Sequence, residues 1–83
     1  MKNFTAQIKI RLKKGILDVQ GKAVEQALHS MEYTQITEVR IGKLVELKIQ
    51  AENQEKAINL VNQASEKLIA NPIIEDYNVE IIE

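Results

Sequence analysis

The sequence predicts an α+β domain built as a two-layer sandwich, with an antiparallel sheet of three to four strands and two helices on one face. Some segments carry an apolar residue at every second position, which is typical of a half-buried strand. Between them, apolar residues recur three or four positions apart, which indicates an amphipathic helix. The 83 residues fit one domain, residues 1–83, without a linker, an internal repeat or a low-complexity segment.

The first half of the chain predicts a strand followed by a helix. Apolar and polar residues alternate from Phe4 to Leu12, and Gly15 then interrupts the pattern. Asp18 is placed to cap a helix at its amino end. The apolar stripe of that helix comprises Val19, Ala23, Val24, Ala27, Leu28 and Met31. Gly21 lies in the first turn, where glycine costs about 1 kcal/mol relative to alanine, so we expect another backbone to approach closely there.

The second half predicts strand material, a second helix and a last strand. The middle strand residues of one parity are Val39, Ile41, Val45, Leu47 and Ile49. Gly42-Lys43 interrupts this series. The residues before and after it stay on the same face of the sheet if the chain forms a hairpin loop of odd length or a bent continuous strand, and both possibilities remain open. Asn53 is expected to cap the second helix, and Asn71-Pro72 to end it. The apolar positions of that helix are Ala57, Leu60, Val61, Ala64 and Leu68.

The last strand should point Tyr77, Val79 and Ile81 inward. The complete order resembles the ferredoxin-like βαββαβ arrangement, with the middle segment forming one long or two short strands. Three apolar residues fall at positions that alternate with the inward-pointing residues of their segments, so they should lie on the opposite face: Leu44, Ile74 and Ile82. We therefore expect apolar surface to remain available for a second subunit.

The size and composition favour a homo-oligomer. A chain of this length buries only about 60% of the surface that its unfolded form exposes. Without cysteine and with a single histidine, neither a disulfide nor a metal is expected to compensate. We therefore predict that the chain oligomerises, and both a homodimer and a tetramer are open at this point. The amino-terminal residues lack the apolar segment of a signal peptide, so we expect a cytoplasmic protein.

The charge argues against nucleic acid and membranes as partners. The net charge is −1, whereas proteins that bind phosphate backbones or anionic lipids usually carry an excess of basic residues. A local basic stripe consists of Lys2, Lys9, Arg11, Lys13 and Lys14. We interpret it as a solvated strand face that hinders edge-to-edge aggregation.

The sequence offers no group of residues suited to catalysis, and we expect no cofactor and no metal. His29 falls on the polar side of the first helix and is predicted to be a solvated surface residue. The segment from Gly15 to Lys22 resembles a phosphate-binding loop only superficially. Its spacing is one residue too long, and Ala23 stands where serine or threonine would hold magnesium.

Four ordered blocks of the sequence resemble the PurS family. They are residues 14–23 (KGILDVQGKA), residues 39–43 (VRIGK), Glu46-Leu47, and residues 68–77 (LIANPIIEDY). The resemblance covers nearly the whole chain. Val19 departs from the proline that is common at that position of the family, and proline suits a first helical position without being required there.

The resemblance implies a non-catalytic small subunit of the phosphoribosylformylglycinamidine synthase complex, which acts in de novo purine (IMP) biosynthesis. In that family a glutaminase subunit releases ammonia, and an ATP-dependent synthetase subunit consumes it. The small subunit, as a dimer, bridges the two and assists ammonia transfer, so no active site of its own is expected. The residues implied to contact these partners are Lys14, Gly15, Asp18, Gln20, Gly21, Lys22, Arg40 and Lys43.

An ACT-like domain that senses a small molecule is the alternative function. Such domains share the βαββαβ order and bind amino acids at a dimer interface, beside a glycine of the first loop. Gly15 or Gly21 would serve in that role.

Overall fold

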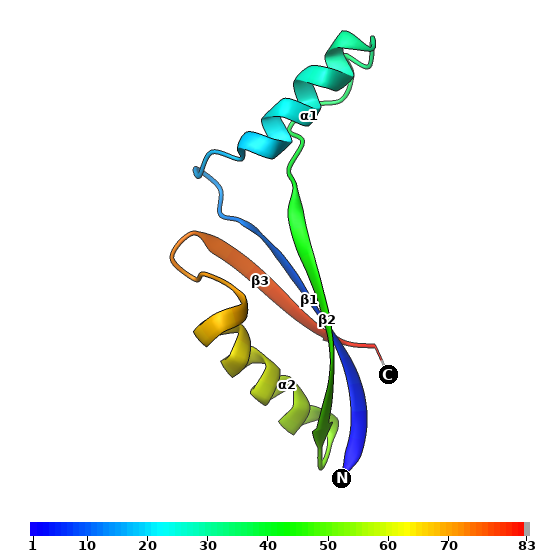
Figure 1. The fold of residues 1–83 in the computed structure, drawn as a ribbon, viewed down its shortest axis with the longest axis vertical. Coiled ribbons are helices and arrows are strands. Elements are labelled where there is room, and N and C mark those ends of the chain that lie inside the picture. Colours follow the sequence, from blue (N-terminus) through cyan, green and yellow to red (C-terminus); the bar gives the residue numbers. More distant parts are fainter. Residues whose placement is uncertain (83) are drawn as a thin grey trace.

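The structure of the protein is a computed structural model that describes residues 1–82. Its elements in chain order are β1 (Lys2–Leu12), α1 (Val19–Ser30), β2 (Gly42–Ala51), α2 (Gln54–Ala64), the π-helical turn η1 (Ser65–Ile69) and β3 (Glu75–Ile81). The strands form one antiparallel sheet in the order β2-β1-β3 (Figure 1). No helix within residues 1–82 is long and apolar enough to cross a membrane.

The central strand β1 places its apolar residues in register with those of both neighbours. Ile8 lies opposite Val45 on β2 and Val79 on β3. Residues directly opposite in an antiparallel ladder project from the same face of the sheet. The three strands therefore present one common apolar face, as the alternation in the sequence predicts.

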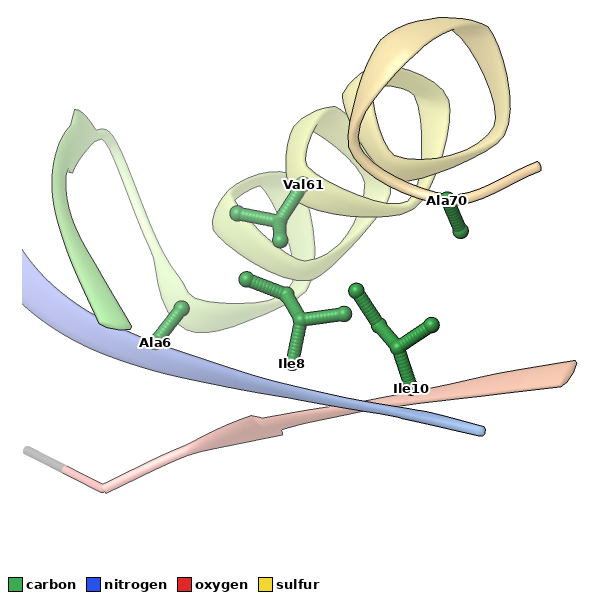
Figure 2. Packing of buried hydrophobic residues seen from close by; sticks show 5 residues of the cluster. All are labelled: Ala6, Ile8, Ile10, Val61 and Ala70. Atoms are coloured by element: carbon green, nitrogen blue, oxygen red, sulfur yellow. The ribbon is translucent and has the colours of Figure 1, made fainter. Parts of the chain in front are cut away.

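Helix α2 covers this apolar face and completes the core (Figure 2). Ala6, Ile8 and Ile10 point from β1 toward the helix and are at most 2% exposed. Val61 lies above Ile8, and Ala70 closes one end of the cluster. The half-buried residues packed around this cluster are Val45, Leu47, Ile49, Ile69, Tyr77, Val79 and Ile81. The inward orientation predicted for the last strand is confirmed.

Helix α1 does not join α2 on the sheet. It projects beyond the end of the sheet, alongside the segment that returns to β2 (Figure 1). The expectation of two helices on one face is therefore wrong for the chain by itself, and the ferredoxin-like order is not confirmed. The molecule measures 52 × 26 × 14 Å, and its radius of gyration is 16.3 Å, compared with about 12 Å for a compact domain of this length.

The middle segment forms a single strand, so the sheet has three strands and not four. β2 begins at Gly42, and Val39 and Ile41 remain outside it. A Cβ atom on Gly42 would lie 2.5 Å from the carbonyl oxygen of Ile10. The glycine thus marks the point where the returning chain meets β1, and the strand starts only there. Leu44 is 60% exposed, as its parity predicts.

The second helix begins as predicted, because the Asn53 side chain accepts a hydrogen bond from the Lys56 backbone N–H at 2.9 Å. It ends in the π-helical turn, where the Ala70 N–H donates to the Ser65 carbonyl at 2.8 Å, just before Asn71-Pro72. The inward positions are Ala57, Val61 and Ser65. Three predicted inward residues are exposed: Leu60, Ala64 and Leu68. The three-stranded sheet covers only a narrow stripe of the helix, and the π-helical turn changes the helical phase before Leu68.

Ile8→Ala should destabilise the fold by about 2–5 kcal/mol, because it removes a fully buried side chain and leaves a cavity in a small core. Urea-induced unfolding of both proteins measures the difference. Ile73→Ala is the matched control, since the same atoms are removed from a side chain that is 81% exposed, and the expected change is within about 0.5 kcal/mol. Equal losses in the two variants would contradict the assignment of the core.

Candidate functional site

The residues implied in partner contact gather where the sheet meets α1. Lys14 and Gly15 lie in the loop after β1, and Gly15 adopts a φ of +88°, which favours glycine. Gln20 and Lys22 are exposed in the first turn of α1. The structure places the other four implied residues at the same junction: Asp18, Gly21, Arg40 and Lys43.

Asp18 joins the start of α1 to the chain entering β2. One carboxylate oxygen, Oδ1, accepts a hydrogen bond from the Gly21 N–H at 2.8 Å and so caps the helix. The other, Oδ2, accepts from the Ile41 N–H at 2.7 Å. The predicted cap is confirmed. The second bond is a long-range contact that periodicity in the sequence does not reveal.

Gly21 allows the helix to approach the returning chain. It is the buried residue of α1, and a Cβ atom there would lie 2.3 Å from the Val39 carbonyl oxygen. The predicted close approach of a second backbone is therefore confirmed. Any side chain at this position would push α1 away from residues 39–41 and weaken both bonds of Asp18.

Two further side chains of α1 hold the returning segment. Glu25 Oε1 accepts from the Val39 N–H at 3.2 Å. His29 Nε2 lies 2.7 Å from the Ile36 carbonyl oxygen, so this nitrogen carries the hydrogen and donates it. His29 is half-buried and bonded, which corrects its interpretation as a solvated residue. Sequence reasoning missed Glu25. Glu25 lies seven residues after Asp18 and four before His29, so the three residues fall on one face of the helix. This spacing is the signal in the sequence that could have identified Glu25.

Arg40 and Lys43 are both engaged within the chain. Arg40 Nη2 donates to the Leu12 carbonyl oxygen at the end of β1. Lys43 Nζ lies 3.3 Å from Glu75 Oε2, and Glu75 Oε1 accepts from the Asn71 N–H at 2.7 Å. The two cations therefore connect the entry of β2 to the end of β1 and to the start of β3.

The pKa values of both carboxylates are lowered by these contacts. Hydrogen bonds from the backbone N–H groups of Gly21 and then Ile41 lower the pKa of Asp18, and the nearby charge of Arg40 adds to the effect. The Asn71 N–H, followed by Lys43, lowers the pKa of Glu75. Each group is held in its ionised, hydrogen-bonded form, which suits a structural link and not proton transfer at neutral pH.

A pocket of about 330 Å³ opens beside Asp18. Its wall contains apolar and polar groups, including Leu12, Leu17, Val19, Gln20, Ile41 and Lys43. About 16 Å of helix separates Asp18 from His29, so the two do not form an acid–base pair. Within residues 1–82, no three histidine, cysteine or acidic side chains are grouped to hold a metal.

Asp18→Asn should make thermal stability less dependent on pH in the acid range. The folded pKa of Asp18 lies below its ordinary value of 3.8. Its contribution to stability is therefore complete above that value and is lost as pH falls through the lower, folded pKa. Thermal unfolding followed by circular dichroism between pH 6 and about pH 2 measures the slope. Glu75→Gln should act with the same sign, and an unchanged slope in Asp18→Asn would contradict the assigned hydrogen bonds.

Known proteins resemble the chain over nearly its full length. The family model for PurS, described as phosphoribosylformylglycinamidine (FGAM) synthase, matches residues 5–83. The phosphoribosylformylglycinamidine synthase subunit PurS of Bacillus subtilis is 44% identical, with 96% of this chain and 94% of that protein covered. The PurS subunit of Methanocaldococcus jannaschii is 33% identical, with 94% of each chain covered.

Solved structures share the fold as well. The crystal structure of the Thermotoga maritima purS subunit aligns with a TM-score of 0.90 at 31% identity, over 98% of this chain and 93% of that one. A chain of the PurLQS structure from the same organism gives a TM-score of 0.90 at 32% identity, over 99% and 100%. The Bacillus subtilis PurS structure gives 0.83 at 44% identity, over 96% and 99%. With both its sequence and its extended fold matched from end to end, the chain belongs to the PurS family.

Proposed function

We propose that this chain is the non-catalytic small subunit of phosphoribosylformylglycinamidine synthase in cytoplasmic de novo purine biosynthesis. In this role it bridges the glutaminase and the ATP-dependent synthetase subunits and assists the transfer of ammonia between them. The observation that carries the proposal is the likeness to a chain of the Thermotoga maritima PurLQS structure, at a TM-score of 0.90 over 99% of this chain.

The shape of the chain supports a bridging role. A bridge needs two separate surfaces, and α1 extends away from the body formed by the sheet and α2 (Figure 1). The polar contacts from Asp18 and Glu25 hold this helix at a defined angle to β2. A fixed angle between the two surfaces would keep two partner proteins in register, and proximity of that kind favours direct transfer of a reactive product.

We divide the implied contact residues by their exposure and by the contacts that they make within the chain. Asp18, Gly21 and Arg40 are used inside the chain. The exposed members are Lys14, Gly15, Gln20, Lys22 and Lys43, of which Lys43 also pairs with Glu75. We propose that this exposed group touches a partner subunit, and that Asp18, Gly21 and Arg40 fix the shape of the junction that presents it.

A homodimer is the second part of the proposal. Much of the apolar stripe predicted for α1 is exposed in the described part of the chain: Val19 is 68% exposed, Val24 40% and Met31 64%. Tyr33 and Ile36 beside it are exposed too. A contiguous apolar surface of this kind is typical of a subunit interface. A second copy supplies the burial that the small core and the elongated shape leave missing.

Adding the protein to the cognate glutaminase and synthetase should make formylglycinamidine ribonucleotide synthesis from glutamine dependent on its presence. Ammonia as the nitrogen donor should support the synthetase without it, because the bridge is needed only when ammonia must pass between two active sites. Product formation with each donor, with and without the protein, tests the proposal. Equal rates from glutamine in both mixtures would refute it.

The double variant Val24→Ser, Met31→Ser should shift the protein from dimer to monomer at micromolar concentration, because it removes apolar area from the exposed side of α1. Sedimentation equilibrium measures the change. Leu60→Ser, Leu68→Ser is the matched control: it introduces two polar groups at exposed positions of α2 and η1 and should leave the dimer intact. Dissociation by the control alone would place the interface on α2 instead.

A further inference from the structure

An open pocket of about 530 Å³ lies on the side of the sheet that α2 leaves uncovered, close to the entry of β2. The residues that matter for its chemistry are Lys9, Arg11, Arg40, Lys43, Asp76 and Asn78. Lys9 and Arg11 alternate with the buried Ile8 and Ile10 on β1, so they project from the face opposite α2.

The pocket is cationic although the whole chain carries a net charge of −1. Lys9, Arg11 and Arg40 line it together with the carboxylate of Asp76, while Lys43 lies opposite Ile10 and so projects from the face that α2 covers. Arg40 uses Nη2 to bond Leu12, and Lys43 pairs with Glu75. Lys9 and Arg11 are exposed, and within residues 1–82 neither forms an ion pair. These two cations are available to an external anion.

Gly42 keeps this pocket open. It lies directly opposite Arg11 in the ladder, and a Cβ atom there would come within 2.5 Å of the Ile10 carbonyl oxygen. Residue 42 therefore has no side chain to occupy the space beside Arg11. The hollow is set by the backbone, and a ligand would enter it without displacing a side chain of residue 42.

We propose that this pocket binds an acidic segment of a partner subunit, which adds Lys9 and Arg11 to the surface used in the proposed complex. The inference rests on the proposed function, which supplies the partner. The guanidinium of Arg11 can hold a carboxylate through two parallel hydrogen bonds. Asn78 offers an amide that can pair with a peptide group. Lys9 and Arg11 are exposed, in line with their interpretation as a solvated strand face, and the proposal adds contact with a partner to that interpretation.

A protein segment fits the pocket better than a small phosphorylated molecule. Sites for small ligands usually enclose most of the ligand surface, and this pocket opens onto an uncovered sheet. Asp76 would repel a multiply charged phosphate placed among the cations. Asp76 lies directly opposite Arg11 in the ladder, whereas Lys9 lies opposite the neutral Asn78. A single carboxylate of a peptide can therefore approach from the side of Lys9 with less repulsion than a multiply charged phosphate.

The double variant Lys9→Gln, Arg11→Gln tests the proposal in the reconstituted complex. Its affinity for one of the two partner subunits, measured by calorimetry, should fall at least ten-fold, and the remaining binding should depend less on salt. Lys48→Gln, Lys67→Gln is the control, since it removes two positive charges at exposed positions outside the pocket. Circular dichroism melting of both variants checks that each is folded.

The outcomes separate the two proposals. Unchanged affinity of the pocket variant for both partners, in a complex that still requires the wild-type protein for glutamine-dependent synthesis, would overturn the pocket alone. Equal losses in the pocket variant and the control would overturn it too, because the effect would then be one of net charge. Saturable binding of pyrophosphate without any change in partner affinity would instead identify a small-anion site. If the wild-type protein does not support synthesis from glutamine, the bridging proposal fails first.

Discussion

The pairing of β1 on both of its edges is the constraint on which the rest of the structure depends. Ile8 lies opposite Val45 and Val79, so a shift of one residue in either ladder would turn the apolar face of a neighbouring strand toward solvent. Helix α2 packs on this aligned face. The end of β1 also receives the contact from Arg40, and thus sets where the returning chain enters β2.

The position of α1 follows from polar contacts and not from apolar burial. Asp18, Glu25 and His29 bond backbone groups of residues 36–41, and Gly21 lets the two backbones approach. This arrangement leaves the apolar side of the helix exposed. A helix attached by its polar face can present its apolar face to another molecule without first detaching from its own chain.

Much of this structure could be predicted from the sequence because local rules determine it. The alternation in β1 and β3, the caps at Asp18 and Asn53, the close approach at Gly21 and the exposure of Leu44 all depend on a few neighbouring residues. The location of α1 could not be predicted in this way. An apolar stripe indicates that one face is buried, but does not identify the surface that buries it, and a second subunit serves as well as the chain's own sheet.

At the junction between the sheet and α1, contacts between residues close in the sequence could be predicted, whereas contacts between distant residues could not. The loop and cap residues lie together in the structure because they are close in the sequence. The bond from Asp18 to Ile41 and the pairing of Lys43 with Glu75 join residues more than twenty positions apart. Such contacts depend on the completed topology, which periodicity along a single chain does not encode.

The thinness of the molecule has a consequence for whatever binds to it. The smallest dimension is 14 Å, and in the body of the molecule α2 lies on one face of a sheet whose other face is bare (Figure 1). A protein seated on the bare outer face would contact the strands directly, whereas one on the opposite face would meet α2 first. The two would be separated by one sheet and one helix, along a chain that is 52 Å long.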